Sequence, residues 1–320
     1  MRVVLGIDTS CYMTSVALCA ADDGGADGPF FQQRQLLTVA QGERGLMQSE
    51  AVFQHVSRLP GLVEQLLAEH PQAQIVSVCA SVRPRPQADS YMPVFRVGEG
   101  TGRAMASALR VPFVETTHQQ GHLRAARVDT ALQAENPHLA LHLSGGTTEV
   151  LLARGLDIAL LGGTGDLHAG QLIDRIGVAM GLSFPAGPQL EQLAMRGESQ
   201  ARLPASVQGL TCHFSGAETQ ALRWIQAGTQ AREVVAAEVF DCVARTVSRL
   251  ILAGCEQAQV QDALLGGGVA SSALIREAVA ARVAKRNRAI RLHFARPELS
   301  GDNAVGVALI GKDMRLGGQG

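Results

Sequence analysis

Short apolar segments that end in polar or glycine-rich turns recur along the chain and predict β-strands. The first covers residues 3–7, and residues 15–19 follow within the reach of a hairpin. Comparable segments lie at residues 75–80, 111–114, 139–143, 149–153, 263–265 and 292–295.

Helices are expected between these strands. Apolar residues recur with a helical period over residues 50–69, where Pro60 predicts either two helices or a kink. Further helices are expected over residues 98–109, 168–180, 233–257 and 303–315, and directly after the glycines at 266–268.

The two halves of the chain show the same order of elements. Each begins with a strand, a turn that contains Ser or Thr and a second strand, and continues with helices and a further strand. This order predicts two α/β lobes that face one another across a cleft. We expect lobe I to cover residues 1–137, completed by a C-terminal helix at about 300–320, and lobe II to cover residues 138–299.

Composition narrows the range of functions. The 320 residues are 46% hydrophobic and 18% charged, and the net charge of -1 provides no global basic field for nucleic acid. Any RNA contact therefore needs a local basic patch or a partner protein. The six cysteines show no C-x-x-C spacing, which is typical of free thiols in the cytoplasm. The chain opens with a strand rather than a signal peptide, and no apolar run approaches the ~20 residues of a membrane span.

Two histidines four residues apart, His118 and His122, are candidates for metal binding. On a helix this spacing places both imidazoles on one face, where they reach one ion. Surface or hydrogen-bonded histidines can have the same spacing, and a metal needs a further ligand. Asp302 is a candidate, although its place before the last helix is more typical of an N-cap. A zinc-protease H-E-x-x-H motif is disfavoured because Gln119 follows His118.

Three turns rich in small residues follow apolar strands, at residues 8–10, 144–148 and 266–268. Small residues let backbone N–H groups approach phosphate oxygens, and a helix N-terminus after residue 268 favours an anion. Each turn alone is more simply an ordinary tight turn, but three of them at strand ends favour a nucleotide cleft. The chain contains neither a P-loop nor a G-x-G-x-x-G motif.

Seven short motifs occur in order along the chain: GIDTSC at 6–11, HQQGH at 118–122, LSGGT at 143–147, PAGP at 185–188, FSG at 214–216, GGV at 267–269 and DNA at 302–304. Together they resemble the TsaD family of tRNA threonylcarbamoyladenosine transferases, formerly labelled as sialoglycoprotein endopeptidases. The resemblance extends from residue 3 to about residue 313.

The resemblance implies an α/β fold of the actin-like, hexokinase-like (ASKHA) type, with a double RNase H-like architecture and two lobes around a nucleotide cleft. It implies an acyltransferase that moves a threonylcarbamoyl or carbamoyl group to an acceptor amine, by default that of the adenosine beside the anticodon of tRNA. The donor is an adenylate, threonylcarbamoyl-AMP or carbamoyl-AMP, with ATP as the alternative nucleotide. Expected partners are tRNA and other proteins of the threonylcarbamoyladenosine pathway.

The resemblance also assigns residues. It implies one divalent metal, iron or zinc, held by His118, His122 and Asp302, which favours the ligand role of Asp302 over the cap. It implies that substrate and nucleotide are bound by Asp8, Ser10, His142, Leu143, Ser144, Gly145, Gly146, Asp174, Gly187, Gly267, Gly268 and Ser272. No nucleophile is assigned, and Cys11 is expected to be a small packing residue.

The chain departs from the family pattern at four places. Tyr12-Met13 replace an Asp-Glu pair, and Arg83-Pro84-Arg85-Pro86 replace Gly-Pro-Gly in what is either an acceptor or partner contact or a solvated loop. Ser272 replaces Asn, and only Asp166 remains of the acidic residues near 162–168. These departures favour a divergent paralogue that keeps the donor and metal chemistry and changes the acceptor. The alternatives are a carbamoyl-type transferase with a different acceptor and a non-catalytic subunit of a true family enzyme; retained ligands argue against the subunit.

Overall fold

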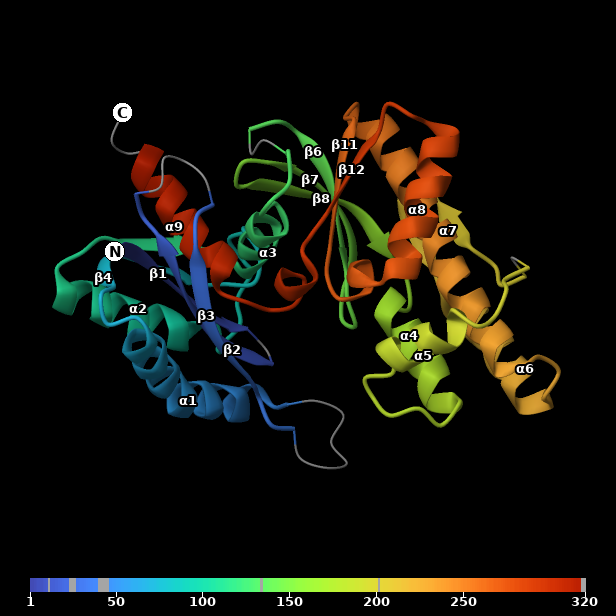
Figure 1. Cartoon of the computed structure of the whole chain (residues 1–320), viewed down its shortest axis with the longest axis horizontal. Coiled ribbons are helices and arrows are strands. Elements are labelled where there is room, and N and C mark those ends of the chain that lie inside the picture. Colours follow the sequence, from blue (N-terminus) through green and yellow to red (C-terminus); the bar gives the residue numbers. More distant parts are fainter. Residues whose placement is uncertain (11, 23–26, 40–45, 133–134, 201, 318–320) are drawn as a thin grey trace. The chain divides into compact units, whose positions relative to one another are not determined.

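The computed structural model of the chain divides into two units of mixed α/β structure (Figure 1). It describes residues 1–10, 12–22, 27–39, 46–132, 135–200 and 202–317. Unit 1 consists of Met1–Asp129 with Gly301–Gly320, and unit 2 is Thr130–Ser300. The first unit ends at Asp129, eight residues before the predicted end of lobe I at residue 137. The predicted boundary stays a prediction.

Unit 1 is built on a sheet in which, among the described residues, five strands take the order β3-β2-β1-β4-β5. The strands are β1 (Arg2–Ser10), β2 (Met13–Ala20), β3 (Phe30–Leu36), β4 (Gln74–Ser81) and β5 (Phe113–Thr116). The first three are antiparallel, and β4 and β5 continue parallel to β1. The predicted hairpin is confirmed, because Ser10 pairs with Met13 across a tight turn. Cys11 lies outside the described residues.

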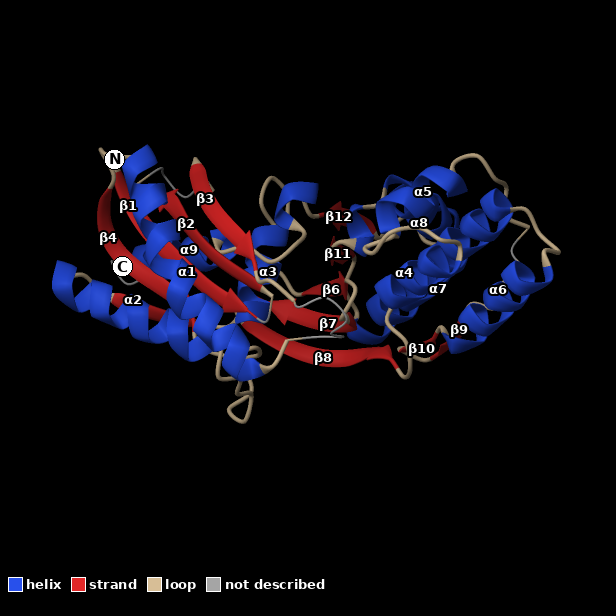
Figure 2. Cartoon of the chain, turned by 90° about the horizontal axis from the view of Figure 1, so that it is seen from below, coloured by secondary structure: helices blue, strands red, loops and turns tan. Residues whose placement is uncertain are grey.

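Helices cover both faces of this sheet (Figure 2). They are α1 (Gln48–Glu69), α2 (Phe95–Leu109), α3 (His118–Ala126) and α9 (Val305–Gly317). On one face, α1 and α2 bury an apolar core that includes Leu5, Ile7 and Leu66. On the other face α9 lies unusually close to the sheet, since a Cβ on Gly6 would stand 2.5 Å from the amide nitrogen of Ala308. The glycine in β1 thus lets the C-terminal helix reach the sheet.

One helix of 22 residues continues through Pro60, so the alternative of two helices is wrong and the kink stays a prediction. Proline removes one N–H that would otherwise bond to the carbonyl of Val56. Val56 is 55% exposed, so this face is open to water and the unmatched carbonyl can be hydrated. The core residues Leu59 and Leu62 hold the helix against the sheet.

Unit 2 contains a sheet in which the described residues form seven strands, in the order β12-β11-β6-β7-β8-β10-β9. The strands are β6 (His138–Leu143), β7 (Thr148–Arg154), β8 (Asp157–Thr164), β9 (Ser206–Gln208), β10 (Thr211–His213), β11 (Asp262–Gly266) and β12 (Arg291–Phe294). The helices are α4 (Ala169–Ala179), α5 (Gly187–Ala194), α6 (Ser215–Ala227), α7 (Arg232–Ala258) and α8 (Ala273–Arg286). The long helix α7 packs against the sheet and its neighbouring helices, and its buried side chains form much of the core of this unit (Figure 2).

Two details of unit 2 differ from the sequence predictions. Gly162 and Gly163 lie inside strand β8, which the apolar segments do not predict, and the backbones of Leu210 and Thr148 leave no room there for a Cβ atom. The glycines at 266–268 do not open a helix directly. A short 3-10 turn, Val269–Ser271, intervenes, and Ser272 caps α8 by accepting a hydrogen bond from the amide of Ile275.

Two further predictions concern the cysteines, expected to be free thiols, and the helices, none of which is expected to span a membrane. Cys19, Cys79, Cys212, Cys242 and Cys255 are all free and buried. None of the helices in the described ranges has both the length and the apolar character that a bilayer span requires.

Candidate metal centre and nucleotide pocket

Helix α3 carries both candidate histidines on its first turns, and its start is held firmly. Thr117 and Gln120 form a capping box, in which the hydroxyl of Thr117 accepts from the amide of Gln120. The amides of His118 and Gln119 donate to the carbonyl oxygens of Arg83 and Pro84, each at 3.0 Å. The loop after β4 therefore satisfies free N–H groups of α3 and fixes the position of His118.

Three donor atoms converge beside this helix. Nε2 of His118 and Nε2 of His122 lie 3.0 Å apart, and Oδ1 of Asp302 lies 3.1 Å from His122 Nε2 and 3.7 Å from His118 Nε2. Ligands bound at about 2.0–2.2 Å to a single ion lie about 3.0–3.5 Å from one another. The three side chains, all within unit 1, therefore have a common point within coordination reach.

Asn303 makes a capping contact at the start of the last helix, next to Asp302. Helix α9 begins at Val305, and the side chain of Asn303 accepts the amide hydrogen of Val305 at 3.0 Å. The carboxylate of Asp302 is turned to the histidines instead, and its Oδ2 accepts a hydrogen bond from the hydroxyl of Ser10 at 3.2 Å. The sequence pattern therefore predicts a cap in the correct turn, where Asn303 makes the capping contact.

A close crossing of α3 and α9 brings Asp302 to the histidines. A Cβ on Gly306 would lie 1.9 Å from the carbonyl oxygen of Gly121, so only glycine fits at this position. Gly121 stands between the two histidines in the sequence, and its own Cβ position is 3.0 Å from the side chain of Val307. The glycine of the HQQGH motif thus serves the helix crossing that completes the ligand set.

Asp8 supports the centre from β1. Its buried carboxylate faces Nδ1 of His118 at 3.1 Å and accepts a short hydrogen bond from Ser81. Burial alone would raise the pKa of Asp8, but His118 and Ser81 together hold that pKa below its usual value. Burial likewise lowers the pKa of His118, whereas the charge and hydrogen bond of Asp8 more than offset this and raise the pKa to about 9. Asp8 and Ser10 were predicted as substrate ligands; the structure brings both to the candidate metal centre.

The donor set fits a divalent cation. When Nδ1 of His118 donates to Asp8, its Nε2 carries a lone pair that faces Nε2 of His122 and Oδ1 of Asp302. A proton on Nε2 of His122 or a cation between the three atoms satisfies this arrangement, and the raised pKa of His118 shows that the surroundings favour positive charge. Two imidazoles and a carboxylate are typical of zinc and non-haem iron, and a carboxylate behind one histidine is a usual support for that ligand.

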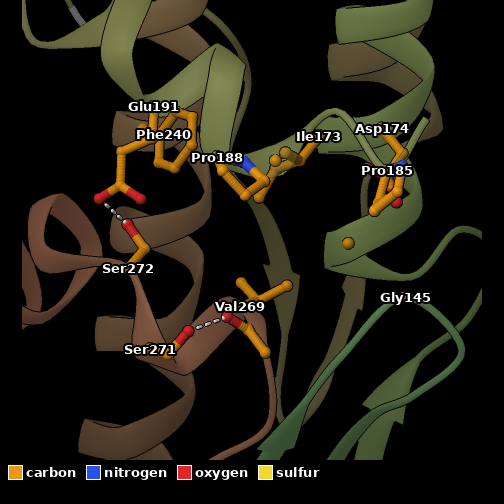
Figure 3. A pocket seen from close by; sticks show the side chains of 13 residues that line it. Gly145, Ile173, Asp174, Pro185, Pro188, Glu191, Phe240, Val269, Ser271 and Ser272 are labelled. Carbon is orange, nitrogen blue, oxygen red and sulfur yellow. Dashed lines mark hydrogen bonds between the residues drawn. The ribbon is translucent and has the colours of Figure 1, made fainter. Parts of the chain in front are cut away.

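A cavity of about 350 Å³ lies in unit 2, within the size range of small-molecule sites (Figure 3). Five of the predicted nucleotide residues line it, namely Gly145, Asp174, Gly187, Gly268 and Ser272. The predicted residues His142, Leu143, Ser144, Gly146 and Gly267 belong to the strand end and turns beside it and are not among its lining residues.

Glycines shape the walls of this cavity. Gly267 has a φ of +94°, and a Cβ there would lie 2.3 Å from the carbonyl oxygen of Leu143, so the chain crosses the end of β6 only with glycine. Gly170 in α4 packs equally close to the turn at Ser144. By contrast, a Cβ on Gly145 would meet nothing within 4 Å, so the backbone of this turn is open to a ligand.

The lining chemistry suits a nucleoside better than a phosphate group. Ile173, Pro185, Pro188, Phe240 and Val269 provide apolar surface, whereas the lining contains two carboxylates and no basic residue. One oxygen of Asp174 accepts the amide of Ala186 at 2.8 Å. Glu191, which the sequence analysis missed, accepts hydrogen bonds from the hydroxyl of Ser272 at 2.7 Å and from the amide of Leu274 at 3.1 Å (Figure 3).

Comparison with known proteins identifies relatives of the whole chain. A family model named TsaD, described as tRNA N6-adenosine threonylcarbamoyltransferase, matches residues 33–309. A protein of that name from Aromatoleum aromaticum is 32% identical over 326 residues, which cover 99% of this chain and 92% of the relative. Another from Zymomonas mobilis is 31% identical and covers 99% of this chain and 88% of the relative.

Solved structures with a similar fold have much lower sequence identity. HypF from T. kodakarensis aligns with a TM-score of 0.61 at 14% identity over 99% of this chain, which spans 48% of the HypF chain. A ROK family glucokinase from Streptomyces griseus, solved with glucose and AMPPNP, aligns with a TM-score of 0.54 at 11% identity, over 97% of this chain and 99% of the kinase. The predicted α/β fold of the actin-like, hexokinase-like type is confirmed.

Proposed function

The chain belongs to the TsaD family of tRNA N6-adenosine threonylcarbamoyltransferases, and we propose that it transfers a threonylcarbamoyl group from an adenylate to N6 of an adenosine in tRNA. The observation that carries this proposal is the retention of a complete ligand set, His118, His122 and Asp302, in a chain that the family model matches over residues 33–309. A non-catalytic subunit would have no need of two ligands on one helix and a third in the turn before another, where the two helices cross only through glycine.

The cavity in unit 2 supports an adenylate as the donor. Its apolar residues suit the two faces of a purine, and the carboxylates of Asp174 and Glu191 suit ribose hydroxyls, which donate to them. The turn at Gly145 has open space for a phosphate and adds no charged side chain there. We propose threonylcarbamoyl-AMP as the donor, supplied in the cytoplasm by a separate synthetase.

The residues of the metal centre have distinct tasks in this proposal. His118, His122 and Asp302 hold one iron or zinc ion, which when bound supplies Lewis-acid stabilisation for charge that develops on the carbonyl oxygen of the donor. Asp8 keeps the proton of His118 on Nδ1 and leaves Nε2 for the ion. Ser10 orients the carboxylate of Asp302 through its hydroxyl.

The transfer itself is a single exchange of bonds. The exocyclic amine of adenosine forms a bond to the carbonyl carbon of the donor, the bond from that carbon to the phosphate oxygen breaks, and AMP and one proton are released. A covalent enzyme intermediate on sulfur is disfavoured for the described cysteines, because burial raises the pKa of Cys212, Cys242 and Cys255 to about 11 and that of Cys19 to about 12. Positioning of the two reactants supplies the remaining catalysis.

The test is direct. The purified protein, loaded with iron or zinc, is incubated with unmodified tRNA and threonylcarbamoyl-AMP, and the digested RNA is read by nucleoside mass spectrometry. We expect threonylcarbamoyladenosine with the wild type and none with His118→Ala, provided that this variant keeps the wild-type circular dichroism spectrum. Absence of the modified nucleoside with a metal-loaded wild type, under conditions in which a relative such as that of Aromatoleum aromaticum forms it, would overturn the proposal.

A different acceptor is the second candidate, and one position favours it. Met13 pairs with Ser10, whose hydroxyl contacts Asp302, so residues 12 and 13 stand beside the metal centre. Tyr12 and Met13 carry no charge where the family resemblance leads us to expect Asp and Glu. If Tyr12→Asp with Met13→Glu raises the activity on tRNA above that of the wild type, the natural acceptor differs from tRNA.

A further inference from the structure

We propose that Arg34, Arg83, Arg85 and Tyr91 form a contact surface for an unpaired segment of the RNA acceptor, in which the arginines hold phosphates and Tyr91 stacks on a base. The inference rests on the proposed function, because it names how the acceptor is held beside the metal centre. It concerns the loop at residues 83–94, where this chain has its own sequence in place of the family glycines.

The loop is tied to the metal centre where it begins. Val82 donates to the carbonyl of Thr116 at 2.9 Å, and the carbonyls of Arg83 and Pro84 accept the amides of His118 and Gln119. Arg83 is thus one backbone hydrogen bond from a candidate metal ligand. The carbonyl of Arg83 makes this contact, and the residue as a whole is half-buried.

The loop is tied to the same centre where it ends. The carbonyl of Val94 accepts the hydroxyl of Thr9, the residue that follows Asp8 in β1, at 2.9 Å. The ring of Phe95 lies 5.9 Å, centroid to centroid, from the imidazole of His118. Between these anchors the loop is closed on itself, because the amide of Arg85 donates to the hydroxyl of Ser90 at 3.0 Å. Residues 85–91 therefore lie between two segments, residues 83–84 and 94–95, that each contact His118.

A third arginine contacts the ligand set from another element. Arg34, exposed on β3, approaches the backbone carbonyl of Asp302 with Nη1 at 3.5 Å. The side chain of Arg34 and the backbone of Arg83 thus each contact a residue of the ligand set, Asp302 and His118 respectively. From residue 82 to residue 94, two arginines stand against a single acidic residue, Asp89. In a chain of net charge -1, this is the local basic patch that an RNA contact requires.

Tyr91 identifies the kind of partner. Its side chain is 68% exposed, which leaves an aromatic face in water, six residues along the same loop from Arg85. Proteins that read unpaired RNA stack splayed bases on aromatic rings and hold the backbone with arginine. A paired helix offers no free base face for such a ring. The combination of arginines and an exposed tyrosine therefore favours an RNA loop over a duplex and over an apolar protein surface.

The test measures RNA binding apart from transfer. The full-length protein is titrated with a fluorescent anticodon stem–loop RNA at several salt concentrations. The variants are Arg34→Gln, Arg83→Gln, Arg85→Gln and Tyr91→Ala. The matched control is Arg110→Asn, which removes one exposed positive charge at the opposite end of α2 and tolerates the left-handed backbone of that position (φ 57°). Every variant is first checked for wild-type metal content and melting temperature. If Arg34→Gln differs from the wild type in either property, the test uses the other three variants.

We expect each arginine variant to raise the Kd for the RNA about three- to tenfold and to reduce the slope of log K against log salt by about 0.7–0.9. Tyr91→Ala is expected to raise the Kd about tenfold without changing the salt slope. Arg110→Asn should bind as the wild type does. The proposal is overturned if the loop variants stay within twofold of the wild type, as expected for a loop that contacts a protein, or if Arg110→Asn weakens binding equally.

Failure of this inference and failure of the proposed function give different results. A wild type that forms the modified nucleoside, with loop variants of unchanged Kd and unchanged turnover, removes the inference and keeps the function. A wild type that binds the RNA through the loop but forms no modified nucleoside removes the function and keeps the loop as an RNA contact.

Discussion

Gly306 of α9 and Gly121 of α3 lie so close that a Cβ on Gly306 would stand 1.9 Å from the carbonyl oxygen of Gly121. This contact sets the distance between the helix that carries the histidines and the turn that carries Asp302. The metal centre is therefore controlled by two residues that have no side chain and that do not touch the proposed ion.

Replacement of Gly306 by alanine should disturb the centre at a distance. The added methyl group cannot be accommodated by a side-chain rotation, because the obstacle is backbone, so α9 must shift. We expect a loss of about 1–3 kcal/mol of stability together with reduced zinc content, measured by thermal unfolding and by elemental analysis. The control is Gly100→Ala in α2, where a Cβ meets nothing within 4 Å; it should stabilise by about 0.5–1 kcal/mol. Unchanged zinc in Gly306→Ala would contradict this account.

Asp8→Asn should weaken metal binding while leaving all three ligands in place. The substitution removes the negative charge that faces Nδ1 of His118 at 3.1 Å and makes the histidine a poorer ligand. Loss of such a supporting carboxylate typically lowers metal affinity about 10–100-fold, which competition with a chromogenic chelator would measure. Ser81→Ala, which removes a donor to Asp8, should have a smaller effect in the same direction. Zinc affinity equal to that of the wild type in Asp8→Asn would show that Asp8 does not support the site.

Gly145→Val should block the cavity of unit 2 without harming the fold. The new side chain would enter open space, since no atom lies within 4 Å of the Cβ position. A steric cost of about 1–3 kcal/mol corresponds to roughly five- to 150-fold weaker binding of AMP, measured by calorimetric titration. Gly216→Ala in α6, away from the lining residues, is the control and should bind AMP normally. If Gly145→Val binds AMP with wild-type affinity, the nucleotide occupies another site.

Asp262 should make the stability of unit 2 dependent on pH. Hydrogen bonds from Arg291 lower the pKa of Asp262 from 3.8 to about 2. Burial acts in the opposite direction, and a hydrogen bond with His293 lowers the pKa further. Because the folded pKa lies below the unfolded value, this stabilisation is present above about pH 4 and is lost as the pH falls towards 2. The difference in unfolding free energy between wild type and Asp262→Asn should therefore shrink from pH 6 to pH 3 in urea titrations. Asp157→Asn, at an exposed position of β8, should show no such trend.

Much of the fold could be predicted because strand and helix signals in this chain are local. The apolar runs at 75–80 and 139–143 became β4 and β6, and the helix expected over 233–257 became α7. Strand β3 was not predicted, because its sequence FFQQRQL is mostly polar and its residues are half-buried or exposed at the edge of the sheet. Its pairing with β2, rather than its own composition, makes it a strand.

The site was harder to predict than the fold, for a physical reason. The spacing of His118 and His122 identifies them as candidate ligands in the sequence. Asp302 lies 180 residues from His122, and only the packing of α9 on α3 brings it close to the histidines. The family resemblance, not the local sequence, favoured Asp302 as a ligand. Glu191 gave no signal at all, since a lone acidic residue in an amphipathic helix looks like part of a solvated face. Its hydrogen bond to Ser272 becomes visible only in the folded unit.

The separation of Asp302 from the histidines has a consequence for biosynthesis. During translation His122 leaves the ribosome 180 residues before Asp302, which at about 5–20 residues per second takes roughly 10–40 seconds. In that interval the nascent polypeptide offers two imidazoles without their carboxylate, and the whole of unit 2 must emerge before α9 can return to the first sheet. Tight capture of the proposed cation is thereby postponed to the end of synthesis.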